Sequence, residues 1–263
     1  MIRAEKRNKE LNQVKQLVQD IRMGMPKIGT RKLYYLLKND FERQNIKIGR
    51  DALYDYLRQE NMLIKPRKSY IKTTNSKHWL KKYPNLLKEV KIERPEQVFV
   101  SDITYIKSRE RTHYLSLVTD AYSRKIMGYK LSDDLSANNV LQALKMATCQ
   151  LKMKNKLLHH SDRGLQYCSA LYQTELKAKN IIPSMTDGYD CYQNALAERI
   201  NGILKQEFLF IKCNNGNELK ELIDESIITY NNKRPHLSLK MKTPNFIHEK
   251  SSKASLAALN NFI

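Results

Sequence analysis

The stretch QVFVSDITYI, residues 97–106, is rich in β-branched and aromatic residues and predicts a strand with one acidic residue, Asp102, at its centre. Further strands are predicted at residues 113–119 and 125–131, followed by a helix at 136–153 and a short strand at 156–160. Consecutive strands followed by alternating helix and strand are typical of a mixed sheet flanked by helices. The fold class is therefore predicted to be α/β from about residue 96 onward.

The residues before this sheet have the spacing of helices. Apolar residues recur three and four apart between residues 5 and 22, which predicts an amphipathic helix. Thr30 is the expected N-cap of a second helix, and Asp51 caps or opens a third. Short helices joined by brief turns suit a small all-α helix-turn-helix domain, whose last helix would lie in a major groove. A helical bundle whose lysines only face solvent is the alternative.

The positive charge of the chain is concentrated near its start. The 263 residues contain 47 Lys and Arg against 27 Asp and Glu, a net charge of +20. Residues 1–90 hold 22 basic and 9 acidic side chains, a net of +13. A polyanion such as DNA is therefore the leading partner. We expect the contacts to lie on the third helix and in the basic segment after it: Arg50, Arg58, Lys65, Arg67 and Lys68.

Other classes of protein are disfavoured by what the sequence lacks. No run approaches the roughly 18 apolar residues of a membrane span, and the first residues lack the apolar centre of a signal peptide. A soluble, cytoplasmic protein without a membrane partner is expected. The 4 cysteines form no C-x-x-C pair, which argues against a zinc ribbon. Trp79, in the basic segment, is expected to anchor against the following domain.

Three carboxylates are candidates for chemistry. Asp102 interrupts an apolar strand, Asp162 follows a predicted strand and precedes a glycine, and Glu198 lies in a helix predicted over residues 192–208. At 100° per residue, Lys205 projects from the same helix face as Glu198. Taken singly, each acid is also consistent with an ordinary solvated or paired side chain.

Together, the three acids suggest a metal site. Carboxylates that converge would repel one another without a cation, and Mg²⁺ or Mn²⁺ prefers oxygen ligands. Two such ions can stabilise the attacking and leaving oxygens of a phosphodiester. A nearby Lys205 could hold a phosphate as a point charge.

The motifs around these residues resemble those of a known family. They are VSDITYI at Asp102, HSDRGLQY at Asp162, NALAERINGILKQE at Glu198, and YNNKRPHLSLKMKTP near the C-terminus. There are 35 residues between Asp162 and Glu198, and Lys205 follows Glu198 by seven. In these motifs and this spacing the chain resembles the bacterial insertion-sequence DDE transposases of the OrfB type, in the IS-three group. The N-terminal runs IGTRKLYYLL and KIGRDALYDYLRQENML resemble the family's helix-turn-helix segment. Leu165, Gln193 and Arg199 depart from the family's pattern without touching the acids.

The resemblance implies an RNase H-like catalytic core, similar to retroviral integrase, in which Asp102, Asp162 and Glu198 hold two Mg²⁺ or Mn²⁺ ions. Lys205 would contact the DNA end, His160 would shape the loop at Asp162, and the run Arg234–His236 would be structural or DNA-contacting. The expected organisation is a helix-turn-helix-like domain, a basic linker, an integrase catalytic core and a tail, over residues 1–62, 63–95, 96–248 and 249–263.

The activity implied by the resemblance is cleavage at element ends and transfer of the resulting 3′-hydroxyl to target DNA. The implied partners are terminal inverted repeats, target DNA and further copies of this chain. The product of an upstream frame (OrfA) is a further partner or fusion. Two alternatives stay open: a DNA-binding regulator of transposition without catalysis, and an RNase H-like nuclease acting on RNA·DNA hybrids.

Overall fold

A mixed five-stranded sheet forms the centre of the chain. The computed structural model describes residues 2–64, 79–152, 156–187 and 194–251. The strands lie in the order β3-β2-β1-β4-β5. Their bounds are β1 Val98–Lys107, β2 Thr112–Asp120, β3 Ile126–Ser132, β4 Leu157–Ser161 and β5 Ile181–Met185. Strands β1 to β3 pair antiparallel, whereas β1, β4 and β5 pair parallel. The predicted α/β class is confirmed.

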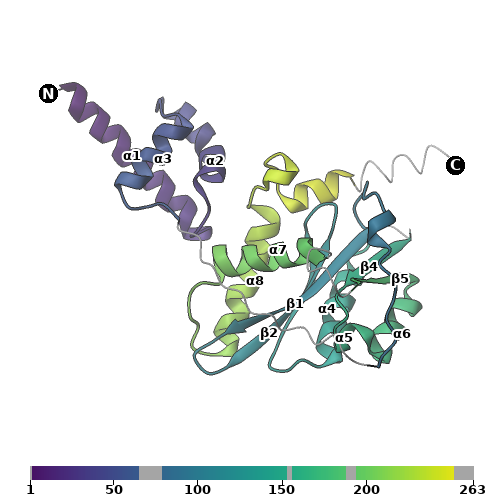
Figure 1. The fold of residues 1–263 in the computed structure, drawn as a ribbon. Coiled ribbons are helices and arrows are strands. Elements are labelled where there is room, and N and C mark those ends of the chain that lie inside the picture. The colour runs from purple at the N-terminus through teal and green to yellow at the C-terminus, as the bar shows by residue number, and fades with distance from the viewer. Residues whose placement is uncertain (1, 65–78, 153–155, 188–193, 252–263) are drawn as a thin grey trace.

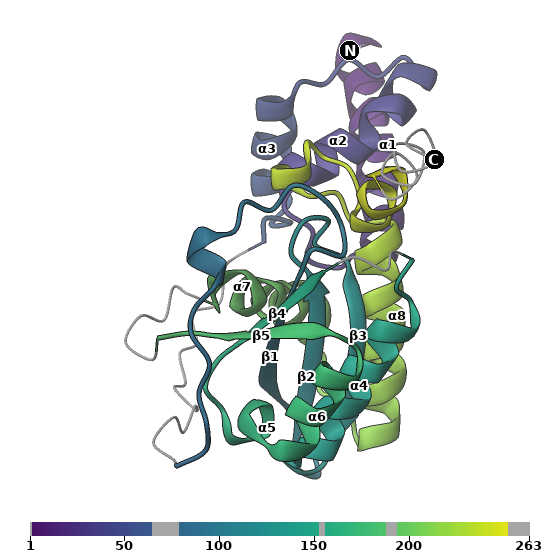
Figure 2. The same cartoon turned by 90° about the vertical axis from the view of Figure 1, so that its right-hand side faces the viewer.

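Helices cover both faces of this sheet (Figures 1 and 2). One face carries α4 Ala137–Cys149, α5 Leu165–Cys168 and α6 Ala170–Ala178, and the other carries α7 Ala195–Ile203 and α8 Gly216–Asn232. Strand β1 is buried on both sides because its apolar residues alternate between two clusters. Phe99 packs with Val140 and Leu144 of α4, while Val100 packs with Ala197 of α7.

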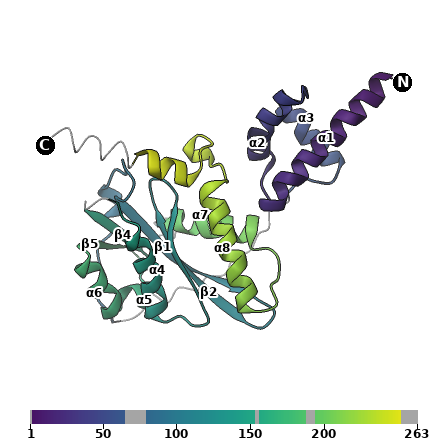
Figure 3. The same cartoon turned by 180° about the vertical axis from the view of Figure 1, so that it is seen from behind.

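The N-terminal helices pack on one another and stand apart from the sheet (Figures 1 and 3). They are α1 Ile2–Gly24, α2 Thr30–Arg43 and α3 Arg50–Gln59. Four leucines of α2 and α3 are completely buried: Leu33, Leu37, Leu53 and Leu57. We call these three helices the N-terminal module.

Several predicted helix ends are wrong by a few residues. Gly29, not Thr30, is the N-cap of α2, and Asp51 lies inside the first turn of α3 rather than before it. Helix α4 ends at Cys149, four residues before the predicted end at Met153, which lies outside the described residues. The helix predicted to run to Phe208 is α-helical only to Ile203 and continues as a π-helical turn.

The segment after the N-terminal module differs from expectation at the single tryptophan of the chain. The side chain of Trp79 is 92% exposed, so its predicted role as an anchor against the next domain is wrong. The neighbouring Leu80 and Tyr83 pack against the core instead. The predicted DNA contacts Lys65, Arg67 and Lys68 lie outside the described residues. Among the helices that the structure describes, none is long and apolar enough to cross a membrane.

The close approach of helix and sheet at Gly128 of β3 generates a stability prediction. A Cβ added there would lie 2.1 Å from the carbonyl oxygen of Ala143 and 2.7 Å from the amide nitrogen of Ala147, both backbone atoms of α4. We expect Gly128→Ala to lower the free energy of unfolding by about 1–3 kcal/mol, because α4 must move away. Urea unfolding followed by circular dichroism measures this change.

The control is Gly202→Ala in α7, where an added Cβ meets no atom within 4 Å. Alanine restricts the unfolded chain more than glycine does, so this variant should be neutral or more stable by up to about 1 kcal/mol. Equal losses in both variants would contradict the close packing of β3 on α4.

Candidate active site

Two of the predicted acids lie side by side because β1 and β4 run parallel. Val100 of β1 pairs with His160 of β4. Asp102 and Asp162 each follow by two residues, so both extend the pairing by the same step and project from the same face of the sheet. That face is the one covered by α7, since Val100 packs against Ala197.

The third acid comes from α7, which two asparagines attach to β1. The side-chain nitrogen of Asn194 donates to the carbonyl oxygen of Ser101 at 3.0 Å, and Asn201 donates to Oδ2 of Asp102 at 2.7 Å. Glu198 lies midway between these asparagines in the sequence and is exposed. The helix face that carries Asn194, Glu198 and Asn201 is therefore turned toward β1.

The four candidate side chains act on one another electrostatically. The pKa of Asp102 is raised to about 7, first by burial, then by the charge of Asp162, and to a smaller extent by that of Glu198. The hydrogen bond from Asn201 opposes this rise. Burial, then the charge of Asp162, raises the pKa of Glu198. Burial lowers the pKa of Lys205, and the charge of Asp102 opposes this. The charge of Asp162 thus acts on both Asp102 and Glu198, and the charge of Asp102 acts on Lys205.

The acids do not form a closed metal cage. Across residues 2–64, 79–152, 156–187 and 194–251, no three His, Cys, Asp or Glu side chains are close enough together to hold an ion. Asp102 lies in β1, Asp162 directly follows β4, and Glu198 lies in α7.

The loop at Asp162 is shaped by its own sequence. The backbone amide of Gly164 donates to Oδ1 of Asp162 at 3.0 Å, and a Cβ on Gly164 would lie only 3.0 Å from that oxygen. His160 is completely buried, and its Nδ1 is 2.9 Å from Oγ of Ser184 in β5. This contact ties β4 to β5 just before the loop, as expected for a residue that shapes it.

A polar layer on the opposite face of the sheet supports the strands, and it was not predicted. Nε2 of His159 lies 2.8 Å from both the hydroxyl of Ser101 and that of Tyr172. Burial, then the charge of His160, lowers the pKa of His159 to about 3, so this ring is neutral. The motif HSD contains the neighbouring His160, and no pattern in the sequence marks His159 itself.

The predicted DNA-contacting residues of α3 lie on its outer surface. Arg50 and Arg58 are exposed and pair with Asp51 and Asp55 at 2.8 and 2.7 Å. The guanidinium of Arg58 also lies 5.3 Å from the ring centre of Tyr54, which is exposed. These pairs neutralise part of the surface charge, but exposed pairs of this kind are weak and can be exchanged for phosphates.

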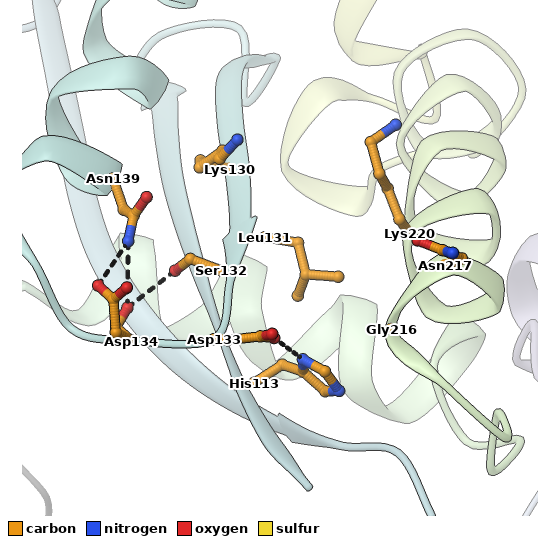
Figure 4. Close-up of a pocket in the computed structure, with 10 residues that line it drawn as sticks. All are labelled: His113, Lys130, Leu131, Ser132, Asp133, Asp134, Asn139, Gly216, Asn217 and Lys220. Carbon is orange, nitrogen blue, oxygen red and sulfur yellow. Dashed lines mark hydrogen bonds and ion pairs between the residues drawn. The ribbon is translucent and has the colours of Figure 1, made fainter. Parts of the chain in front are cut away.

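A pocket of about 350 Å³ lies away from the acids (Figure 4). It opens at the end of β2, where Nδ1 of His113 is 2.6 Å from Asp133. His113 pairs with Ile106, four residues along β1 from Asp102. Its lining contains none of the predicted catalytic residues.

Comparison with known proteins agrees with this geometry. Models described as the integrase core domain match residues 92–191 and 179–244. A 31 kDa protein of insertion element IS600 from Shigella sonnei is 34% identical, over 84% of this chain and 81% of the relative. Transposase InsF of insertion sequence IS3A from Escherichia coli K12 is 32% identical over 66% of this chain, and the match spans 60% of that relative.

A solved structure shows the same fold. A chain of the simian T-cell lymphotropic virus intasome, determined in complex with a PP2A regulatory subunit, superimposes with a TM-score of 0.54 at 17% identity. The match covers 84% of this chain and 70% of that chain. The sheet order, the helices on both faces and the similarity to insertion-element proteins agree. The chain belongs to the insertion-sequence DDE transposases, enzymes with an RNase H-like integrase core.

Proposed function

We propose that this chain binds the ends of a mobile DNA element, cleaves one strand there, and joins the 3′-hydroxyl so formed to target DNA. The observation that carries the proposal is the electrostatic coupling of Asp102, Asp162 and Glu198. Three acids held within reach of one another's charge at an open surface are costly for folding, and a cation-dependent reaction on DNA gives them a use.

The chemistry of the donor set suits divalent metal ions, which would draw the three acids closer together, since in the described residues no three such side chains are close enough to hold an ion. Carboxylate oxygens are the ligands that Mg²⁺ and Mn²⁺ prefer, and the pKa of Asp102 near 7 reflects a carboxylate that lacks compensating charge. In this proposal Asp102, Asp162 and Glu198 hold two ions. When bound, the ions would increase the acidity of the attacking hydroxyl and neutralise charge on the leaving oxygen. Asn201 keeps Asp102 oriented through its 2.7 Å hydrogen bond.

Lys205 holds the DNA end in this proposal. Its charge acts on Asp102 from the end of the helix that carries Glu198. In the first step a water oxygen bonds to phosphorus and the bond from phosphorus to the 3′-oxygen breaks; water gives up a proton to solvent, and the departing 3′-oxygen takes one up to become a hydroxyl. In the second step this hydroxyl loses its proton to solvent as its oxygen bonds to a target phosphorus, and the target's own 3′-oxygen leaves and takes up a proton. Lys205 offers a positive charge to the phosphate oxygens throughout.

The proposed partners follow from the charge and the family. DNA contacts would come from Arg50 and Arg58 of α3 and from the basic residues Lys65, Arg67 and Lys68. We propose assembly of several copies of this chain on DNA. The upstream-frame product is a proposed partner or fusion. The site of action would be the bacterial cytoplasm, on nucleoid DNA.

The first prediction tests catalysis. Glu198→Gln should lower the rate of cleavage of a labelled duplex by about 100-fold or more in Mg²⁺. Metal-based stabilisation contributes several kcal/mol, and each ~1.4 kcal/mol is tenfold in rate. The duplex carries the sequence that flanks this reading frame, and gel analysis measures both nicked and joined products. DNA affinity, measured in parallel, should not change.

Glu221→Gln, an exposed acid on α8, is the matched control and should cleave at the wild-type rate. Wild-type protein that binds this DNA but never cuts it would favour the non-catalytic regulator. Cleavage of RNA·DNA hybrids without joined DNA products would favour the nuclease.

The second prediction concerns pH and Asp102. Its folded pKa of about 7 lies above the unfolded value of about 3.9. The ionised form is disfavoured in the fold, so metal-free protein should lose stability as the pH rises from about 4 to about 7. Asp102→Asn removes this titration. Relative to wild type, it should gain about 2–4 kcal/mol between pH 4.5 and pH 8 in EDTA.

Urea unfolding at several pH values measures the difference. Adding Mg²⁺ at pH 8 should stabilise the wild type and leave Asp102→Asn unchanged, because the variant lacks the carboxylate. A stability difference that is constant from pH 4.5 to pH 8 would show that Asp102 is not perturbed by its neighbours.

The third prediction concerns the outer surface of α3. Each phosphate contact contributes about −0.9 to the slope of log K against log salt on duplex DNA. Arg50→Ala with Arg58→Ala should make the slope less steep by up to about 1.8 and weaken binding. Fluorescence anisotropy at several salt concentrations measures the slope. Lys177→Ala with Lys179→Ala at the end of α6 removes the same charge and should leave the slope unchanged. Equal effects of both pairs would mean that only net charge matters.

A further inference from the structure

A buried ion pair lies directly behind the proposed active site. The guanidinium of Arg234 holds Glu207 with two parallel hydrogen bonds, from Nη2 to Oε1 at 2.6 Å and from Nε to Oε2 at 2.7 Å. The Arg234 side chain is 2% exposed. Lys32 adds a third bond to Oε1 at 3.2 Å. We call Glu207, Arg234 and Lys32 the Glu207 ion cluster. A fork of this geometry fixes orientation as well as charge.

Glu207 belongs to the same turn as Lys205. The chain leaves α7 in a π-helical turn, Leu204–Phe208, in which the amide of Leu209 bonds the carbonyl of Leu204 at 2.8 Å. A π-helical turn is uncommon and often marks a functional site. Within it, the charge of Asp102 acts on Lys205, and Glu207, two residues later, is hydrogen-bonded to Arg234. Because both residues belong to one short turn, a contact that fixes Glu207 also restrains the backbone of Lys205.

Arg234 also contacts His236 and Tyr230. Its Nη1 donates to Nε2 of His236 at 2.9 Å, and its guanidinium lies 5.8 Å from the ring centre of Tyr230. Burial, then the charge of Arg234, lowers the pKa of His236 to about 3. The ring is neutral and accepts at Nε2, so its proton is on Nδ1. The C-terminal RPH motif is thus buried structure and not a DNA-contacting surface.

The cluster also joins the two parts of the chain. Lys32 lies in the first turn of α2, in the N-terminal module, and its side chain is 15% exposed. Nearby, Nζ of Lys27 lies 4.0 Å above the ring of Phe210. Burial raises the pKa of Glu207, but Arg234 and Lys32 outweigh burial and lower it overall, so Glu207 is ionised. The N-terminal module thus contributes one of the charges that hold the π-helical turn.

We infer that Glu207 and Arg234 are positioning residues that hold Lys205 toward the DNA end, and that Lys32 makes this hold depend on the docked N-terminal module. The inference rests on the proposed function, since it assigns Lys205 a role in strand cleavage. The RPH motif then affects the reaction indirectly. Arg234 contacts Glu207, and Glu207 and Lys205 share the π-helical turn, so Arg234 influences Lys205 without touching DNA. Lys32 in turn links DNA capture by α3 to the state of the active site.

The test is a double-mutant cycle between Glu207 and Lys205 in the full chain. Single-turnover cleavage of the flanking-sequence duplex is measured at saturating protein in Mg²⁺, and DNA affinity is measured separately. Glu207→Gln should slow cleavage about tenfold or more with affinity unchanged within about twofold. In a Lys205→Ala background the same change should cost less than about twofold, because the residue that it positions is gone.

Two further variants keep the inference testable if Glu207→Gln fails to fold. Arg234→Lys keeps the positive charge but loses the two parallel hydrogen bonds to Glu207. It should slow cleavage when Lys205 is present and have no further effect in a Lys205→Ala background. Lys32→Met leaves the Glu207–Arg234 pair intact and removes only the contact with the N-terminal module. It should slow cleavage about threefold or more without weakening DNA binding. Glu221→Gln is the control for loss of a carboxylate.

The outcomes separate the two proposals. If Glu207→Gln cleaves like wild type, or costs the same factor in both backgrounds, the cluster only stabilises the fold and the inference is wrong. If Lys205→Ala cleaves at the wild-type rate while Glu198→Gln is inactive, the inference fails and the catalytic proposal stands. If wild type does not cleave in Mg²⁺, both fail.

Discussion

The repulsion between Asp102 and Asp162 is the constraint on which the active-site region depends. Parallel pairing of β1 with β4 brings Asp102 of β1 near Asp162, which directly follows β4. Burial and like charge then raise the pKa of Asp102 to about 7. An apolar residue in place of one of these acids would make the fold more stable. The fold instead surrounds the acids with polar support, which is the expected arrangement where positive charge arrives with a ligand.

Helix α7 supplies that support from one side and leaves the other side open. Asn194 and Asn201 attach the helix to β1, so the height of Glu198 above the sheet is set by two hydrogen bonds. Beyond Ile203 the helix widens into the π-helical turn that carries Lys205. The acids are therefore rigid where they belong to strands. Glu198 and Lys205 instead depend on how both ends of one short helical segment are held.

Local patterns predicted much of the fold, and the rest depended on partners far away in the chain. Strands around Asp102 were predictable because β-branched residues cluster there. The face of α7 bearing Asn201 could equally have been solvated, because spacing identifies a face and not what covers it. Strand β5 is short and contains Pro183, so its own sequence favours a strand only weakly. It forms by parallel pairing with the edge of β4. The Arg234–Glu207 fork joins residues 27 apart, which no local pattern reports.

The excess positive charge has two physically different uses in this structure. On α3 it is exposed, as at Arg50 and Arg58, where water and salt weaken every pair and phosphates can replace the local acids. At Glu207 the positive charge is buried, because the Arg234 side chain is only 2% exposed. Separating Arg234 from Glu207 would leave a buried charge without a partner. Exposed cations suit reversible capture of a long polyanion. Enclosed cations suit a fixed geometry, so the same residue types form loosely paired surface charges on α3 and a fixed contact at Glu207.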